Sequence, residues 1–535
     1  MTARERALPI IDTMPCRAWL WAIGLGLVAA LGFAPLGLWP LALLAMGLQA
    51  VLVARTRNWK QALWLGWLFG WAHFTLGNSW IATAFTHQAA MPAVLGWVAV
   101  PLLAIYLAVY PALAALGARL IVKNGPGWAF ALVFAGAWVV TEWLRSWVFT
   151  GYAWNPFAMA LLGPLDRPGL AALSPLMGTY ALSGVAVLLG TALVLLAAER
   201  RWRVGALVAL LLAVGMYWPA SAPREGSLAV TVVQPNFSQP EINDPRFFEP
   251  SFRKLAALSP RADSQQAGEP RLVLWPESGM ADYLRTGYPQ RYYDRTTAMG
   301  NPLFARRRLG AAAGENSVLL TGATDLEIGT DESGIERALG ARVAITALSS
   351  DGQMLASYYK AHLVPYGEYL PMRELLEPLG LSRLVEGAID FWPGPGPRTI
   401  DLGEYGQAGM QLCYEIVFSG QVVDRDRRPD YIFNPSNDGW FGVAGPPQHL
   451  AQARMRAIEE GLPVIRSTVN GISAVVDARG VVREHLPTGV SGRIDTVVPP
   501  AAAPTLFSRI GNGLSLFWAA LLLAAGVVAM RRKAR

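Results

Sequence analysis

The chain has 535 residues, of which 53% are hydrophobic and only 16% charged, with 20 tryptophans and a formal net charge of +7. Soluble domains average about 25% charged residues, so this composition excludes a wholly soluble protein and predicts that part of the chain lies in a membrane. The basic residues flank apolar runs instead of forming one stripe, so we expect no nucleic-acid partner.

Seven apolar runs precede residue 220, and an eighth lies near the C-terminus. A helix needs about 20 residues to cross a hydrocarbon core of about 30 Å. The first run continues into further apolar runs, so we expect a first anchor and not a cleaved signal peptide. Membrane-crossing helices are predicted near 18–34, 37–54, 62–82, 92–120, 128–149, 172–198, 203–219 and 511–530.

The basic residues indicate how these helices are oriented. Lys and Arg near helix ends stay on the cytoplasmic side. Basic clusters lie before the first run and after the second, fourth, sixth and eighth: Arg4, Arg6 and Arg17; Arg55, Arg57 and Lys60; Arg119 and Lys123; Arg200, Arg201 and Arg203; and Arg531, Arg532, Lys533 and Arg535. We therefore expect both termini in the cytoplasm and the segment after residue 219 on the outer side.

Residues 227 to 498 differ in character from the rest of the chain. Short β-rich runs alternate with polar loops, near 228–234, 271–277, 317–325, 342–350, 354–360, 408–416, 431–438 and 472–480. Runs that are apolar on both faces favour sheets covered by helices, and we expect helices at 289–309 and 447–460. Asp351-Gly352 predicts a hairpin. The Pro-rich stretches 392–398 and 499–504 predict a loop and a linker back to the membrane.

Three of these runs carry a reactive side chain at or near their ends, namely Glu277, Lys360 and Cys413. Each has a plain structural alternative. Glu277 is suited to capping a helix, Lys360 to solvating a sheet edge, and Cys413 to the core, where free cysteines are common. Only as a set do the three residues favour a catalytic site over these structural alternatives.

That set resembles the carbon-nitrogen hydrolase, or nitrilase, superfamily over about residues 227–498. The similar stretches are LVLWPES, YYKAHLVPYGEYLP, QLCYEIVF, NPSNDGWFG and ARMRAIEEGLPVIRSTVNGISAVVD. With the apolar runs included, the whole chain resembles the apolipoprotein N-acyltransferase family. The resemblance implies a multi-span α-helical membrane domain at 1–226 and an α+β nitrilase-like domain, an α-β-β-α sandwich, at 227–498. It also implies a linker, a last transmembrane helix and a basic cytoplasmic tail at 499–535.

By the same resemblance, Cys413 is the nucleophile, Glu277 the general base and Lys360 the electrostatic stabiliser. A free thiol has a pKa of about 8.5 and attacks poorly until a base removes its proton or a cation favours the thiolate. The Lys360 ammonium and the backbone N–H of Tyr414 would hold the oxyanion of the tetrahedral intermediate, where one donor is worth about 10²–10³ in rate.

The supporting residues implied by the resemblance are Glu368, which would orient the lysine or the base, and Glu415, whose alternative is an ordinary salt bridge. Trp440 and Phe441 match positions near the acyl pocket, although an aromatic pair beside a turn is more often simple packing. The stretch 234–244 lacks the Lys-Trp pair expected at about Ile242 and Asn243, which bears on substrate selectivity but not on the catalytic set.

The implied reaction has two steps. Cys413 attacks an acyl ester of a membrane phospholipid, typically phosphatidylethanolamine, and the resulting thioester is attacked by the α-amino group of the N-terminal diacylglyceryl-cysteine of an apolipoprotein. The catalytic domain would face the periplasm of a bacterial inner membrane, and the bilayer itself is a partner. We expect no cofactor, and the scattered histidines predict no metal site.

Transfer requires water to be kept from the thioester, so we expect a closing segment. The candidate is 370–392, which mixes apolar and charged residues like an interfacial arm, and its alternative is a surface helix on the sandwich.

Two other functions remain open at this point. A membrane-anchored amidase or nitrilase-type hydrolase would use the same three residues and release free fatty acid. A transporter with an inactive outer domain would need more intramembrane polar residues than His73, Asn78 and Glu142, and His73 is more typical of a packed core residue.

Overall fold

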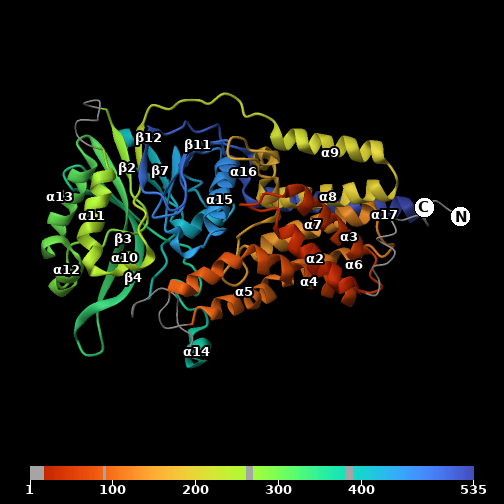
Figure 1. Ribbon diagram of the computed structural model, residues 1–535, viewed down its shortest axis with the longest axis horizontal. Coiled ribbons are helices and arrows are strands. Elements are labelled where there is room, and N and C mark those ends of the chain that lie inside the picture. The colour runs from red at the N-terminus through yellow and green to blue at the C-terminus, as the bar shows by residue number, and fades with distance from the viewer. Residues whose placement is uncertain (1–16, 88–91, 261–268, 380–389, 535) are drawn as a thin grey trace.

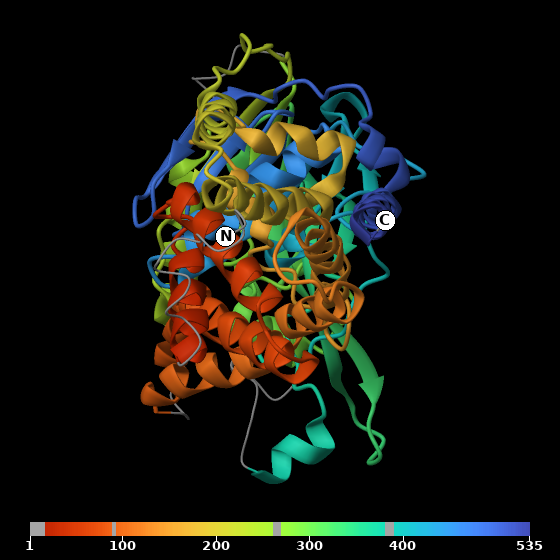
Figure 2. The ribbon, with the colours of Figure 1, turned by 90° about the vertical axis from the view of Figure 1, so that its right-hand side faces the viewer.

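A bundle of helices lies against a β-sandwich in the computed structural model, which describes residues 17–87, 92–260, 269–379 and 390–534 (Figure 1). The bundle includes the C-terminal helix: viewed along the long axis of the molecule, Asn512–Ala534 packs beside the helices Trp128–Arg145 and Gly178–Ala198 (Figure 2). Its helices are α2 (Ala18–Ala30), α3 (Trp39–Ala54), α4 (Trp59–Gly77), α5 (Val94–Leu107), α6 (Val109–Ile121), α7 (Trp128–Arg145), α8 (Gly178–Ala198), α9 (Trp202–Tyr217) and α17 (Asn512–Ala534).

Three stretches of the described chain are long and apolar enough to cross a membrane, namely Val94–Ile121, Gly178–Ala198 and Asn512–Arg532. Shorter apolar helices are Ala18–Ala30, Trp39–Ala54 and Trp202–Tyr217. Small residues allow close packing between them: a Cβ on Gly47 of α3 would lie 2.1 Å from the backbone oxygen of Gly190 in α8. Such close approach of helix backbones is typical of membrane helix interfaces.

The predicted bounds of three helices change. The run 92–120 forms two helices that meet at Ala108, with Pro101 inside α5. The run 62–82 ends as a helix at Gly77 and continues as a 3₁₀ helix, Ser79–His87, while the run 172–198 becomes α-helical only at Gly178, after a 3₁₀ helix at Leu170–Leu176.

Polar residues inside the bundle have packing and hydrogen-bonding roles. His73 lies among aromatic rings, 5.3 Å from Phe33 and 5.7 Å from Phe69 between ring centroids. Asn78 accepts a hydrogen bond from the Tyr152 hydroxyl at 2.8 Å, and Glu142 accepts one from the backbone N–H of Phe157 at 2.8 Å. These contacts give the transporter alternative no support.

Two six-stranded sheets form the sandwich. The first has the order β12-β1-β2-β3-β4-β5 and the second the order β11-β10-β9-β8-β7-β6. The strands of the first sheet are β1 (Ala229–Gln234), β2 (Arg271–Leu274), β3 (Ser317–Thr330), β4 (Glu336–Ser349), β5 (Met354–Tyr359) and β12 (Gly492–Val497). Those of the second are β6 (Thr399–Asp401), β7 (Gln407–Met410), β8 (Tyr431–Ser436), β9 (Val464–Thr468), β10 (Ser473–Val476) and β11 (Val482–Leu486).

Helices cover the outer face of each sheet, so the predicted α-β-β-α sandwich is confirmed. Buried side chains of both sheets, such as Val232, Leu320 and Phe433, share the core between them. The first sheet is covered by α11 (Phe248–Leu258) and α13 (Pro302–Ala313), with α12 (Gln290–Thr296) beside them. The second is covered by α15 (Gly445–Glu460), whose Met455 and Ile458 pack into the core of the helical bundle.

Several local predictions are corrected. The helix predicted at 289–309 breaks into α12 and α13, because Asn301 caps a new helix that begins at Pro302. The strand predicted at 408–416 ends at Met410, and Cys413 begins a 3₁₀ turn, Cys413–Val417. The Asp351-Gly352 hairpin is confirmed between β4 and β5, with Gly352 at φ +85.

The remaining elements of the sandwich side are short or were not predicted. Strands β6, β9, β11 and β12 are additions to the predicted set. The short helices are α10 (Gln239–Asn243), α14 (Arg373–Leu376) and α16 (Leu506–Ile510).

Candidate active site

The Lys360 ammonium lies at the centre of a buried charged cluster where the strands of the first sheet end. Its Nζ is 2.7 Å from Oε1 of Glu368 and 3.4 Å from Oε1 of Glu277, and its side chain is 1% exposed. Burial alone would lower the pKa of Lys360, but the carboxylates of Glu368 and Glu277 outweigh burial and raise it. Lys360 therefore carries its charge throughout the physiological range.

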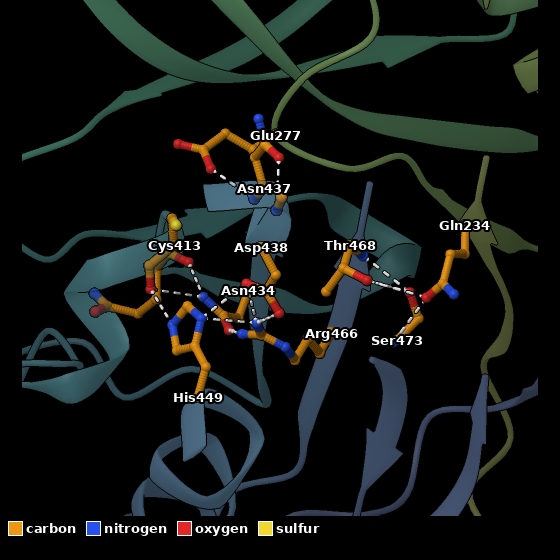
Figure 3. Close-up of polar contacts among 12 residues, drawn as sticks. Gln234, Glu277, Cys413, Asn434, Asn437, Asp438, His449, Arg466, Thr468 and Ser473 are labelled. Carbon is orange, nitrogen blue, oxygen red and sulfur yellow. Dashed lines mark hydrogen bonds and ion pairs between the residues drawn. The ribbon is translucent and has the colours of Figure 1, made fainter. Parts of the chain in front are cut away.

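Glu277 lies just beyond the end of β2, held by contacts on both sides. Its Oε2 accepts a hydrogen bond from the backbone N–H of Asn437 at 2.9 Å (Figure 3). Its Oε1 faces Lys360. The backbone of β3 passes very close: a Cβ on Gly322 would lie 1.9 Å from the Glu277 backbone oxygen. Glycine at 322 is therefore required to leave Glu277 in this place.

Cys413 is a buried free cysteine at the start of the 3₁₀ turn that follows β7. Its φ of +47 is unusual for a residue other than glycine, which indicates a conformation imposed by the surrounding contacts. Burial and the Glu277 carboxylate raise the pKa of the thiol well above its usual value, against the opposing effect of Lys360. At rest the sulfur is thus a thiol, and it needs a base to become a nucleophile.

Glu415 ties the cysteine turn to the segment that carries Lys360. Its carboxylate accepts hydrogen bonds from the backbone N–H groups of Ala361 at 2.7 Å and Leu412 at 2.8 Å, and from the hydroxyl of Tyr358 at 2.9 Å. Burial raises its pKa to about 7. These bonds give the side chain a structural function that the salt-bridge alternative does not describe.

The other sequence-predicted residues surround this centre. Glu368 receives the backbone N–H of Val364 on Oε2 at 2.7 Å, which fixes its other oxygen against Lys360. The Tyr414 side chain is buried, with its hydroxyl 3.5 Å from the backbone oxygen of Gly151 in the helical half of the chain. The backbone of Tyr414 belongs to the same peptide group as the Cys413 carbonyl.

Trp440 and Phe441 form an aromatic contact between the sandwich and the helical bundle. The Phe441 ring lies 4.8 Å from that of Trp80 and 5.6 Å from that of Trp154, and the Trp440 ring lies 5.7 Å from that of His87. Phe441 is buried and Trp440 half-buried. The pair thus lies at the border of the two halves, in or against the same buried cluster as Cys413.

A second buried polar cluster lies beneath Cys413 and was missed by the sequence reasoning. The imidazole Nε2 of His449 is 3.1 Å from the Cys413 carbonyl oxygen, its Nδ1 is 2.9 Å from Asp438, and Arg466 binds both oxygens of Asp438 (Figure 3). The available signal was an arginine inside an apolar strand, VIRST, because a buried charge is rarely left unpaired.

The predicted closing segment 370–392 lies largely outside the described residues, since 380–389 are among those not described. What is described begins with α14 and a 3₁₀ turn, Glu377–Leu379, and exposed side chains such as Met372 and Leu375. Cys16, the other cysteine, also lies outside the described residues. Among the residues that are described, no group of three His, Cys, Asp or Glu side chains is placed to hold a metal ion.

Two family models of known proteins match this chain, one in each half. A family model for the apolipoprotein N-acyltransferase N-terminal domain matches residues 25–192, and one for carbon-nitrogen hydrolase matches residues 230–496. A solved amidase from Nesterenkonia sp. overlaps 52% of this chain and 93% of its own at 17% identity, with a TM-score of 0.34, which is too low to support an argument.

Curated relatives match along nearly the whole length. A protein named apolipoprotein N-acyltransferase from Bradyrhizobium diazoefficiens is 34% identical, covering 99% of this chain and 98% of its own. Proteins of the same name from Allorhizobium ampelinum and Vibrio parahaemolyticus are 33% and 30% identical, covering 96% and 94% of this chain and 96% and 95% of their own.

Proposed function

The chain belongs to the apolipoprotein N-acyltransferase family and acylates apolipoproteins, and from this premise we propose that Cys413 carries the acyl group as a thioester, with Glu277 as general base and Lys360 as electrostatic stabiliser. The observation that carries this proposal is the meeting of all three groups in one buried site. Glu277 and Lys360 come from ends of one sheet and Cys413 from the other, and both charged groups act on the thiol.

In the first step, Glu277 takes the thiol proton as the sulfur attacks the ester carbonyl of a phospholipid. The Lys360 ammonium and the Tyr414 backbone N–H stabilise the oxyanion of the tetrahedral intermediate. The C–O bond to the glycerol oxygen then breaks, Glu277 returns the proton to that oxygen, and a lysophospholipid leaves. The raised pKa of Cys413 supports a base-dependent attack over a stored thiolate.

In the second step, the α-amino group of a diacylglyceryl-cysteine attacks the thioester carbonyl. Glu277 accepts a proton from the amine, the C–S bond breaks, and the thiol is restored as the amide forms. Both steps use the same oxyanion donors. Glu368 keeps Lys360 in place through the 2.7 Å contact, and Glu415 fixes the turn relative to the lysine.

The membrane placement belongs to the same proposal. Residues 1–226 form a membrane domain, 227–498 a catalytic domain on the periplasmic side of a bacterial inner membrane, and 499–535 a linker, a last crossing and a cytoplasmic tail. Support comes from the apolar helices, including α17 packed beside α7, and from α15, which joins the sandwich to the bundle. The acyl donor is phosphatidylethanolamine, and Trp440 and Phe441 border its acyl chain.

A transfer assay tests this proposal. Purified protein in lipid is given phosphatidylethanolamine with a labelled acyl chain and a diacylglyceryl-cysteine peptide. We expect acylated peptide and lysophospholipid in equal amounts, no product from Cys413→Ala, and unchanged product from the matched control Cys16→Ala. Release of free fatty acid without acylated peptide would contradict the transferase and favour the amidase-type hydrolase. Full activity of Cys413→Ala would contradict a thioester on Cys413.

A further inference from the structure

The peptide group that joins Cys413 to Tyr414 is held at its carbonyl by His449, on α15. The His449 Nε2 lies 3.1 Å from that carbonyl oxygen, and the side-chain amide of Asn434 lies 3.4 Å from it. A carbonyl oxygen can only accept a hydrogen bond, so Nε2 must carry a proton. His449 is completely buried, which leaves this donor no competing water.

Asp438 and Arg466 both contact the other ring nitrogen. The His449 Nδ1 lies 2.9 Å from Oδ1 of Asp438, which accepts, and 2.9 Å from Nη2 of Arg466, which donates. The proton on Nε2 is therefore set by the Cys413 carbonyl and not by these two contacts. Burial and the positive charge of Arg466 lower the pKa of His449, while Asp438, which binds Arg466 through contacts of 2.7 and 2.8 Å, opposes them.

This contact has a consequence for catalysis because a peptide group is planar. The Cys413 carbonyl and the Tyr414 N–H point in opposite directions from one rigid trans unit, so fixing the oxygen also aims the N–H. In Figure 3 the Cys413 sulfur lies on the Glu277 side of the turn and its carbonyl on the His449 side. A hydrogen bond at the carbonyl also polarises the amide and strengthens its N–H as a donor.

We propose that His449, held by Arg466 and Asp438, is a positioning residue that aims and polarises the Tyr414 N–H for the oxyanion. This inference rests on the proposed function, in which that N–H is an oxyanion donor. The same cluster also reaches the base, because Asp438 follows Asn437, whose N–H binds Glu277 at 2.9 Å. The Phe441 and Trp154 rings pack against the imidazole, at 5.5 and 5.2 Å between centroids.

Three substitutions at His449 test the proposal. Leucine removes the donor, asparagine places an amide near the Nδ1 position only, and glutamine places its amide nitrogen near Nε2. Two rates are measured on each full-length protein: single-turnover acylation of Cys413 by phospholipid, and alkylation of Cys413 by iodoacetamide. Alkylation displaces iodide from a saturated carbon and builds no oxyanion, so it reports the thiol without the donor.

We expect acylation to fall by about 10- to 100-fold in His449→Leu and His449→Asn, below the about 10²–10³ for complete loss of an oxyanion donor. Alkylation should change by less than about threefold, and His449→Gln should recover most of the acylation rate. If the leucine variant does not fold, the asparagine and glutamine pair decides.

Parallel loss of both rates, or acylation that is unchanged in all variants, would overturn the positioning role. A wild-type protein that is alkylated normally but never acylated by phospholipid would instead overturn the proposed function.

Discussion

Replacing Lys360 with methionine separates the structural and the catalytic roles of the ammonium. The substitution leaves Glu368 and Glu277 facing each other with the cation between them gone, where the Nζ contacts were 2.7 and 3.4 Å. Removing one partner of a buried ion pair costs about 3–5 kcal/mol of stability. Losing an oxyanion donor costs about 10²–10³ in rate. We expect both losses, measured by thermal unfolding and by single-turnover acylation.

The second substitution Glu368→Gln in the Lys360→Met background distinguishes the two effects. It neutralises the orphaned carboxylate and keeps an acceptor for the Val364 N–H, so most of the stability should return while acylation stays low. Lys254→Met is the matched control, since its ammonium lies over the Phe237 ring, away from Cys413. Acylation within about tenfold of wild type in Lys360→Met would refute the oxyanion role.

Gly322→Ala should slow acyl transfer by about 10²-fold without removing a reacting group, because its Cβ displaces the Glu277 backbone, while Gly24→Ala, with open space around it, should not. Protonation of Glu415 near pH 7 turns an accepting oxygen into a donor, so transfer should fall as the pH drops through about 7, and a pH-independent rate would contradict this. The effect of Glu415 on stability has the opposite pH dependence. Its folded-state pKa is raised from 4.5 to about 7, so its contribution to the free energy of unfolding is present below pH 4.5 and is lost as the pH rises through about 7. Unfolding of wild type and of Glu415→Gln, measured as a function of pH, checks this. Glu277→Gln should move the alkylation midpoint of Cys413 to lower pH and Lys360→Met to higher pH, and shifts of one sign in both would refute these electrostatics.

The sequence could point to the candidate site because its reactive residues follow strands in recognisable motifs. Glu277 lies just beyond β2, Lys360 directly after β5, and Cys413 shortly after β7, so finding the strands places the residues at sheet ends. Strands that are apolar on both faces predicted sheets covered by helices, and the resemblance to the nitrilase superfamily implied the two-sheet sandwich. The contacts of Trp440 and Phe441 needed the fold, because their ring partners, His87 for Trp440 and Trp80 and Trp154 for Phe441, come from the helical half of the chain.

The features that escaped prediction depend on contacts between residues distant in the chain. The 3₁₀ turn at Cys413 interrupts an apolar run that has strand periodicity. Glu415 within the turn binds the distant Ala361 N–H, and His449 on α15 binds the Cys413 carbonyl. His449 on a helix and Arg466 in a strand looked unrelated, because only the packing of α15 on the second sheet brings them within 2.9 Å. Tertiary contacts here override local propensity.

The mass of the protein after incubation with phospholipid alone tests the central claim most directly. The account predicts one added acyl mass that maps to Cys413, is absent from Cys413→Ala, persists in Cys16→Ala, and is discharged on addition of a diacylglyceryl-cysteine peptide. An acyl mass on another residue, or acylated peptide formed at full rate with no acyl group ever found on Cys413, would contradict it.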